Sequence, residues 1–411
     1  MGRIEKTFAQ QRELKWLFLD LNSYFASVEQ ELWPELRHKP VGVVPVMTDS
    51  TCCIAASYEA KARGVKTGTM VREARELCPD IQFVEAQHQV YVEFHHKIVR
   101  AVESCVPVSV VLSVDEMACR LIGREREIEK AQEIAERAKQ AIRDQVGRTL
   151  RCSVGLAPNR FLAKVGSEME KPNGLVTILP GELPDILFDL ELRDLPGVGR
   201  RMHERLLKNG VNSVERLCAL SKREMRRIWG GIVGERFWLW LRGEDFEEEP
   251  TRRQTIGHSH VLPPDLRTHE GAYQVAQKLV HKAGARLRKM GFWANRMSLS
   301  LSSGREWQGW KKDVTMVECQ DTLTLLEALN KLWQKRPETP PSAVGVTLFD
   351  LIPDEVHTLD LFSDPKREKL SSAIDKINEK FGSNTIYFGG VHHAKHAAPT
   401  RIAFTSIPDY F

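Results

Sequence analysis

Apolar and polar positions alternate in two different periods over the first 180 residues. Short apolar runs predict buried strands at residues 17–19, 41–46, 108–114 and 151–156. Segments with apolar residues three and four apart predict helices at residues 24–32, 58–64, 71–77, 91–104, 125–146 and 159–170. Because strands and helices are mixed along the chain, we expect one α+β core over most of residues 1–180.

The pattern changes character twice after residue 180. Residues 181–245 are basic and read as helices, and the acidic stretch 247–249 followed by Pro250 predicts a linker. Beyond the linker, strands are predicted at 255–262, 296–302, 311–318 and 343–351, with helices at 269–290 and 321–334. This β-α-β-β-α-β order predicts a small sheet with helices on one face. A further amphipathic helix is predicted at 365–381, within a polar, histidine-bearing tail.

Length and composition fit a soluble intracellular protein. The chain has 411 residues, of which 42% are hydrophobic, so it can form several domains. No apolar run approaches the length that spans a bilayer, and the polar, charged residues 1–15 do not resemble a secretory signal. The eight cysteines are scattered without a C-x-x-C pair, which argues against a zinc ribbon or a thioredoxin-like site.

Charge is concentrated in one part of the chain. The net charge is only +4, but residues 251–313 hold about 12 Lys/Arg against about 4 Asp/Glu, which leaves that stretch near +8 and the remainder near −4. A basic module on a slightly acidic protein is typical of proteins that contact a phosphate backbone. A solvated charged surface is the alternative, and the charge distribution favours nucleic acid.

Three carboxylates follow two of the predicted strands. Asp20 ends the first strand, and Asp115 with Glu116 ends the strand at 108–114. If these strands are neighbours in one sheet, the carboxylates converge at one edge, where they could hold magnesium. Two such ions ~4 Å apart can activate an attacking 3′-hydroxyl and stabilise a leaving pyrophosphate. Acidic residues at strand ends are also common on surfaces, and spacing alone favours that ordinary interpretation.

The neighbouring motifs favour the metal site. The run 20–29, DLNSYFASVE, resembles the first motif of the Y-family DNA polymerases, and residues 113–116, SVDE, resemble their second carboxylate motif. Residues 57–65, SYEAKARGV, resemble the finger motif, and VGLAPNRFLAK at 154–164 with KPNG at 171–174 resembles the end of the palm. The motifs occur in the family's order, and the resemblance covers about residues 15–350. On these motifs the chain is identified as a member of this family, with a likeness to the bacterial DNA polymerase IV branch.

The resemblance implies a role for each matching position. Asp20, Asp115 and Glu116 would be the catalytic metal ligands, together with the Leu21 carbonyl, and two Mg²⁺ ions (or Mn²⁺) the cofactor. Phe25 would be the steric gate that excludes the 2′-hydroxyl of a ribonucleotide, although a core aromatic is the alternative. The other residues expected at the nucleotide are Tyr24, Tyr58, Lys61 and Lys164. The family usually has Arg at position 61, so Lys61 keeps the charge but loses the bidentate fork.

Two modules are expected to hold DNA. Residues 194–199, DLPGVG, resemble a helix-hairpin-helix motif, in which Gly197 and Gly199 let backbone N–H groups face a phosphate, with Arg200 nearby. An ordinary turn between helices is the alternative. The basic β-α-β-β-α-β module resembles the family's little finger, and its candidate contacts are Arg252, Arg253, Arg296, Arg305, Lys311 and Lys312. Trp293, Trp307 and Trp310 could stack on bases, although core packing is favoured.

The tail carries two further candidate features. Thr358 and the following LDLF, with Leu359 and Phe362, resemble the short peptide by which bacterial polymerases attach to the sliding clamp, but the usual leading Gln is Thr358 here. A hydrophobic anchor for the tail is an equal alternative. His392, His393 and His396 have a spacing that could hold a metal, but without acidic or Cys partners a solvated tail is favoured.

Taken with the resemblance, these features predict a multidomain α+β polymerase with a right-hand arrangement. The expected domains are a palm at 1–180 with fingers inserted at about 28–85, a helix-hairpin-helix thumb at 181–248, a little finger at 251–352 and a tail at 353–411. The expected activity is low-fidelity, template-directed DNA synthesis past damaged bases, with primer-template DNA and deoxynucleoside triphosphates as partners.

Two other functions remain open at this point. A non-catalytic, polymerase-like DNA-binding subunit would not need the three carboxylates. A repair factor built on the helix-hairpin-helix motif would bind DNA without binding a nucleotide. In the favoured interpretation the protein is a bacterial monomer of the cytoplasm, associated with the nucleoid and not with a membrane.

Overall fold

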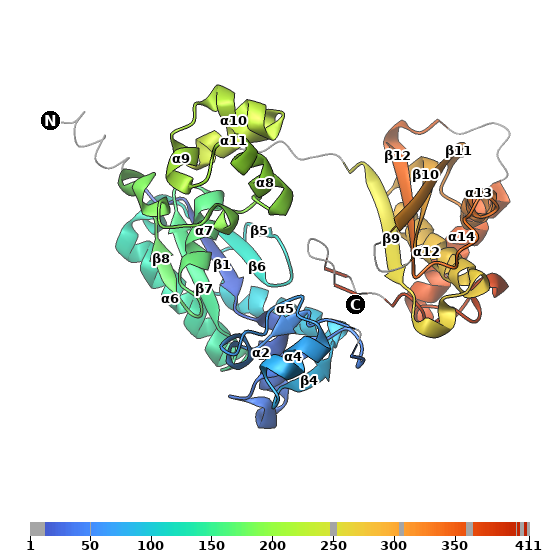
Figure 1. Ribbon diagram of the computed structural model, residues 1–411, viewed down its shortest axis with the longest axis horizontal. Coiled ribbons are helices and arrows are strands. Elements are labelled where there is room, and N and C mark those ends of the chain that lie inside the picture. The colour runs from blue at the N-terminus through green and yellow to red at the C-terminus, as the bar shows by residue number, and fades with distance from the viewer. Residues whose placement is uncertain are drawn as a thin grey trace. The chain divides into compact units, whose positions relative to one another are not determined.

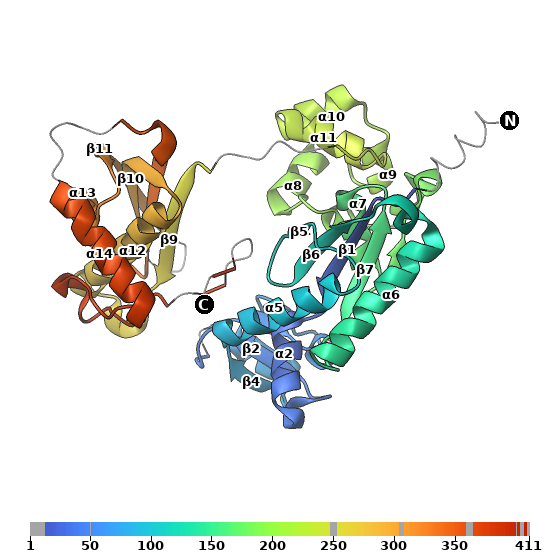
Figure 2. The ribbon, with the colours of Figure 1, turned by 180° about the vertical axis from the view of Figure 1, so that it is seen from behind.

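The computed structural model describes residues 13–49, 51–246, 253–303, 308–358, 365–399, 401–402 and 407–408. The chain forms two compact units: Met1–Glu247 together with Arg401–Phe411, and Glu248–Thr400 (Figure 1; Figure 2). The segment 353–411, expected as a separate tail, is therefore divided between both units. Across the described ranges, no helix is long and apolar enough to cross a membrane.

A five-stranded sheet forms the centre of the first unit. Its strand order is β5 (Val110–Val111), β6 (Glu116–Arg120), β1 (Trp16–Leu21), β7 (Cys152–Ala157) and β8 (Leu175–Thr177). Strand β1 is antiparallel to both of its neighbours, and all six of its residues are buried. A strand buried on both faces reads as a continuous apolar run, which is why β1 was predicted so clearly.

Helices cover both faces of this sheet, and alternate residues of β1 meet different layers. Leu17, Leu19 and Leu21 pack into the core that contains α5 (His88–Glu103) and α6 (Ile128–Gln145). Phe18 packs into the core that contains α7 (Arg160–Met169). Asp20 lies two residues after Phe18, so its carboxylate is directed to the α7 side of the sheet.

A smaller layer is inserted between β1 and α5. It contains the helices α2 (Tyr24–Leu32), α3 (Tyr58–Lys61) and α4 (Val71–Leu77), and a three-stranded sheet in the order β3 (Ala55–Ala56), β2 (Val41–Val44) and β4 (Gln82–Glu85). The helix predicted at 58–64 ends early, because Gly64 has a φ of +93° and turns the chain. Strands β3 and β4 were not predicted.

The strand predicted at 108–114 is wrong in length and position. Only β5 is a strand there, and the chain then turns, with the N–H groups of Leu112 and Ser113 both donating to the Glu116 carbonyl at 2.9 and 3.2 Å. Glu116 therefore begins β6 instead of following a strand. The apolar run continues through this turn, so its length did not mark where the strand ends.

Four helices complete the first unit: α8 (Arg200–Lys208), α9 (Val214–Cys218), α10 (Lys222–Trp229) and α11 (Ile232–Trp240). They are joined to the start of α7 through Asn159, whose side-chain amide donates to the carbonyls of Trp240 and Glu244 at 2.9 and 3.1 Å. The same side chain caps α7 by accepting from the Leu162 N–H at 2.8 Å. Short 3₁₀ turns link the elements, at Pro34–Leu36, Gly123–Arg126, Pro180–Glu182, Asp185–Leu187 and Leu192–Asp194.

The second unit has the predicted β-α-β-β-α-β order. Its antiparallel sheet runs β11 (Gln308–Cys319), β10 (Phe292–Ser303), β12 (Ala343–Pro353) and β9 (Thr255–Val261), and it packs against α12 (His269–Lys289) and α13 (Thr322–Trp333). Short 3₁₀ turns lie at Pro264–Leu266, Asp354–Val356 and Gly389–Val391. Helix α14 (Pro365–Phe381), which has the predicted bounds, is tied to α12 by a bidentate ion pair from Arg288 to Asp375 at 2.6 and 2.9 Å.

Two partly buried histidines make the second unit sensitive to acid. Burial and nearby Lys and Arg side chains lower the pKa of His258 and His281 from 6.5 to about 4. The unfolded chain then binds more protons than the folded chain between pH 6.5 and pH 4, so stability is full above pH 6.5 and is lost as pH falls. His281→Leu should reduce this acid loss by about 3 kcal/mol, measured from thermal unfolding across that pH range. The exposed His393→Leu is the matched control, and an equal change in both variants would contradict the assignment.

Candidate functional site

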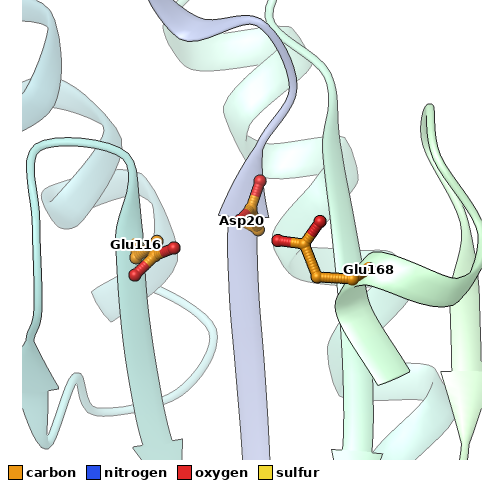
Figure 3. A group of neighbouring side chains, drawn as sticks. All are labelled: Asp20, Glu116 and Glu168. Atoms are coloured by element: carbon orange, nitrogen blue, oxygen red, sulfur yellow. The ribbon is translucent and has the colours of Figure 1, made fainter. Parts of the chain in front are cut away.

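The end of β1 meets the beginning of β6, and this antiparallel pairing brings carboxylates together. Asp20 lies opposite Glu116 in the register, and Glu168 reaches the same place from α7 (Figure 3). Each of these three side chains offers an oxygen, and the three oxygens lie within 4.8 Å of one another. This is the one such metal-ligand group within the described ranges. We call Asp20, Glu116 and Glu168 the carboxylate group.

Asp115, a predicted ligand, is adjacent to this group but is not one of the three. Its carboxylate accepts a hydrogen bond from the Ser113 hydroxyl at 2.5 Å, and its carbonyl accepts from the Leu21 N–H at 2.9 Å. Its charge still acts on Asp20, whose pKa it helps to raise. Leu21 is buried, and its main-chain carbonyl is the atom predicted as an oxygen ligand.

Two lysines neutralise the carboxylate group. Lys171 donates to Asp20 at 2.7 Å and also pairs with Glu168 at 3.0 Å, while Lys164 pairs with Glu116. Asp20 is 5% exposed, and this burial raises its pKa to about 7 against the opposing charge of Lys171. The site is thus a partly buried cluster of opposite charges, in which each of the three carboxylates already contacts a lysine ammonium.

Glu168 and Lys171 were not assigned a role from the sequence. Glu168 lies four residues after Lys164 on α7, which places both side chains on the same side of that helix. Lys171 belongs to the KPNG motif that was quoted only as a family marker. The spacing from Lys164 was a usable signal for Glu168, whereas the ion pair of Lys171 with Asp20 joins residues 151 apart in the chain.

Helix α3 brings the predicted phosphate-binding residues to the same place. The Lys61 ammonium lies 4.6 Å from the ring centre of Tyr58. Burial and the Lys171 charge lower the pKa of Lys61, while Asp20 and Glu168 oppose that change. Burial raises the pKa of Tyr58, with Asp20 and Lys171 also acting on it. Tyr58 and Lys61 therefore lie within electrostatic reach of the carboxylate group.

The predicted gate and its neighbour have different environments. Phe25 is half-buried on α2 and stacks on Tyr91, with ring centroids 4.4 Å apart. Tyr24 is buried, and its hydroxyl donates to the Tyr91 carbonyl at 2.5 Å. The Tyr24 side chain is therefore occupied within the core, which leaves its main chain as the part that could contact a nucleotide.

The predicted helix-hairpin-helix glycines precede α8. Gly197 has a φ of +89°, and Gly199 is the N-cap of α8. A Cβ atom at Gly199 would meet no other atom within 4 Å, so the approach to the first N–H groups of the helix is open. Arg200 is exposed beside them and pairs only weakly with Glu204, at 3.6 Å.

The basic residues predicted on the second unit are only partly within the described ranges. Arg253 is exposed, as are Lys311 and Lys312 on β11. Arg296 instead lies between two carboxylates, Asp313 at 3.6 Å and Asp350 at 3.5 Å. The remaining predicted residues, which lie outside the described ranges, are Arg252, Arg305, Trp307 and the clamp-like segment from Leu359 to Phe362.

Two of the less favoured interpretations can be compared with the structure. Trp293 is 6% exposed, and its indole N–H donates to Asp354 at 2.6 Å. It therefore packs within the second unit, as the interpretation favoured over base stacking predicted. His392 contacts the Tyr387 hydroxyl at 2.9 Å through Nδ1. None of the three tail histidines belongs to the metal-ligand group found within the described ranges.

Comparison with known sequences gives matches along most of the chain. Residues 19–168 match the impB/mucB/samB family, residues 253–361 its C-terminal domain, and residues 193–245 the thumb domain of DNA polymerase iota. A DNA polymerase IV from Moorella thermoacetica is 34% identical over 385 residues, covering 90% of this chain and 94% of the relative. DNA polymerase IV 1 of Bacillus subtilis is 29% identical, covering 90% and 91%.

Solved structures give the same fold. A Y-family DNA polymerase chimera, Dbh-Dpo4(243-245)-Dbh, superposes with a TM-score of 0.69 at 24% identity, covering 82% of this chain and 99% of the other. An insertion ternary complex of Dbh DNA polymerase has the same identity and coverage, with a TM-score of 0.56.

Proposed function

Given that this chain belongs to the impB/mucB/samB family of Y-family DNA polymerases, we propose that Asp20, Asp115 and Glu116 hold two magnesium ions for nucleotidyl transfer. The protein is a DNA-directed DNA polymerase that carries out translesion synthesis. The observation that supports the metal site best is the convergence of Asp20 and Glu116 across β1 and β6, with Asp115 in the adjoining turn.

The donor set fits a hard divalent cation. All ligands are carboxylate oxygens, with the Leu21 carbonyl nearby, and magnesium prefers such donors, with manganese as a substitute. The ammonium of Lys171 at 2.7 Å from Asp20 marks the position as one that favours positive charge. When bound, the ions would supply Lewis acidity to the primer 3′-hydroxyl and to the leaving pyrophosphate.

The lysines and Tyr58 would bind the triphosphate of the incoming deoxynucleotide. Lys171 neutralises Asp20 and Glu168 in this structure, and a cation at the carboxylates would take over that charge and free the ammonium for a phosphate oxygen. Lys61 and the Tyr58 hydroxyl would contact the same triphosphate from α3, as a point charge and a hydrogen-bond donor. Lys164 would contact it from α7 while balancing the charge of Glu116.

The nucleotide and DNA would be placed by separate parts of the chain. Phe25 would lie against the sugar and exclude a 2′-hydroxyl. The open first turn of α8, with Gly197, Gly199 and Arg200, would bind a primer-template phosphate, and Arg253 of the second unit would bind the backbone elsewhere. In domain terms, the five-stranded sheet would be the palm, the three-stranded layer the fingers, α8 to α11 the thumb and the second unit the little finger.

Two partner assignments remain proposals from the sequence. The segment from Leu359 to Phe362 would bind a sliding clamp, and the polymerase would act as a monomer. The non-catalytic alternative is disfavoured because all three predicted carboxylates are present at or beside the site.

Primer extension by the purified full chain tests the proposed function. With Mg²⁺ and all four deoxynucleoside triphosphates, we expect extension opposite an undamaged template and past an abasic site, and no extension when the cation is chelated. Binding of primer-template DNA is measured in parallel by fluorescence anisotropy. Tight DNA binding without extension in Mg²⁺ or Mn²⁺ would contradict the proposal and favour the non-catalytic DNA-binding subunit.

A further inference from the structure

The ring behind the proposed gate is anchored to a fully buried carboxylate. The planes of Phe25 and Tyr91 lie 15° apart at a centroid distance of 4.4 Å. Tyr91 is 0% exposed, and its hydroxyl donates to the carboxylate of Glu29 at 2.6 Å. Phe25 and Glu29 are four residues apart on α2 and so share one side of that helix. Tyr91 therefore contacts the gate with its ring and the next helical turn with its hydroxyl.

Glu29 is an unusual residue for this position. It is 0% exposed, and its side chain accepts hydrogen bonds from the Tyr91 hydroxyl at 2.6 Å and from the Gln87 side-chain amide at 3.4 Å. Burial raises its pKa, and these hydrogen bonds oppose that rise. An apolar side chain could fill the same space without the desolvation penalty of a carboxyl group. What the carboxylate adds is a fixed direction for the Tyr91 hydroxyl.

Tyr91 is also held from its other side. The Tyr24 hydroxyl donates to the Tyr91 carbonyl at 2.5 Å, which fixes the main chain of α5 at this turn. The His88 ring lies edge-on to Phe25 at 6.2 Å and to Tyr91 at 6.1 Å. Phe25 thus rests on a ring that is restrained at its hydroxyl and its backbone.

We propose that Glu29 and Tyr91 are positioning residues that set the location of Phe25 against the sugar, and so determine how strictly ribonucleotides are excluded. The inference rests on the gate role proposed above for Phe25. A steric gate excludes a 2′-hydroxyl only while its side chain stays in place. A displacement of about 1 Å is enough to change a reaction rate by about a hundredfold. The hydrogen bond from Tyr91 to Glu29 restrains the ring on which Phe25 stacks, and so it restrains movement of Phe25 towards Tyr91.

Steady-state incorporation opposite one template base tests this inference. The readout is the ratio of kcat/KM for a deoxynucleotide to kcat/KM for the matching ribonucleotide. Tyr91→Phe keeps the stacked ring and removes the hydrogen bond, and Glu29→Met keeps the volume and removes the acceptor. We expect each to lower the ratio about five- to tenfold through faster ribonucleotide incorporation, with deoxynucleotide kcat/KM changed by less than about threefold.

Two further variants serve as controls. Glu29→Gln keeps an oxygen that can accept from Tyr91, so it should preserve the ratio and act as the conservative rescue of Glu29→Met. Tyr273→Phe removes a partly buried phenol from the second unit and should leave the ratio unchanged. Thermal unfolding of each variant shows whether it is folded, and if Glu29→Met is not, Tyr91→Phe and Glu29→Gln carry the same comparison.

The outcomes separate this inference from the proposed gate. If Phe25→Ala relaxes discrimination but Tyr91→Phe does not, the positioning role is overturned and the gate stands. If Phe25→Ala leaves discrimination intact, the gate assignment fails and the positioning role fails with it. If Tyr91→Phe slows both nucleotides equally, the hydrogen bond is merely structural and the inference is overturned.

Discussion

Asp20→Asn is expected to lower primer extension by at least about a thousandfold, while primer-template DNA is bound as before. Asparagine has nearly the same shape but carries no charge, so it cannot balance a divalent cation at the centre of the site. Asp20 has no substitute, because it lies between the strand that carries Glu116 and the helix that carries Glu168. The measurement is single-turnover extension at saturating Mg²⁺, with DNA affinity from fluorescence anisotropy.

The stability of the same variant distinguishes a functional loss from a folding defect. Burial raises the pKa of Asp20 from 3.8 to about 7 even with Lys171 nearby, so folding penalises its charged form. Removing that charge should leave the thermal midpoint of the metal-free protein unchanged or higher, as is common where a site is strained for function. Asp144→Asn removes an exposed carboxylate of α6 and is the matched control for extension. Extension by Asp20→Asn within about tenfold of the unaltered protein would contradict the metal assignment.

The predicted convergence of Asp20 and Glu116 is found in the structure, but part of the reasoning that led to it was wrong. Asp20 was placed at the end of a buried strand, as the structure has it. Glu116 was expected at the end of a second strand, yet it begins β6. The side chains still converge because β6 is antiparallel to β1, so that its first residue lies opposite the last part of β1. An apolar run shows that a segment is buried, but it does not show where the chain turns.

The rest of the candidate site depends on contacts that no local pattern contains. Glu168 reaches Asp20 from a helix on the face of the sheet, and Lys171 reaches it from the segment after that helix. The Arg-to-Lys departure at position 61 was visible in the sequence, but its setting was not. In the structure the Lys61 ammonium lies over the Tyr58 ring. A lysine at this position offers a point charge in place of the bidentate fork of an arginine. Such arrangements follow from how the inserted layer packs on the sheet.

The second unit was predicted more fully than the site. Its elements are long and strongly periodic, and the order of strands and helices follows directly from their pattern. The last helix matched its predicted bounds, yet its packing on α12 through Arg288 and Asp375 was not foreseeable, because the two residues are 87 positions apart. Periodicity predicts which face of a helix is buried, whereas the partner that buries it is a property of the folded chain.

Phe25→Ala is expected to raise ribonucleotide incorporation by about 10- to 200-fold while leaving the metal ligands in place. The ring is half-buried and stacked on Tyr91, so its exposed edge is the part that could meet a sugar. Removing it opens a space that accommodates a 2′-hydroxyl, and the gain should come from a lower KM and a higher kcat for ribonucleotides. The measurement is kcat/KM for each nucleotide type opposite the same template base.

Loss of the stack with Tyr91 should also lower stability by about 0.5–1.5 kcal/mol beyond the loss of buried area, so thermal unfolding accompanies the kinetics. Phe25→Tyr keeps the ring and should keep discrimination, which makes it the matched control. Deoxynucleotide incorporation by Phe25→Ala should fall by no more than about tenfold, since Asp20 and Glu116 are held by the sheet and not by α2. Unchanged discrimination against ribonucleotides in a folded, active Phe25→Ala variant would contradict the gate assignment. Phe25 would then be a core aromatic residue of α2.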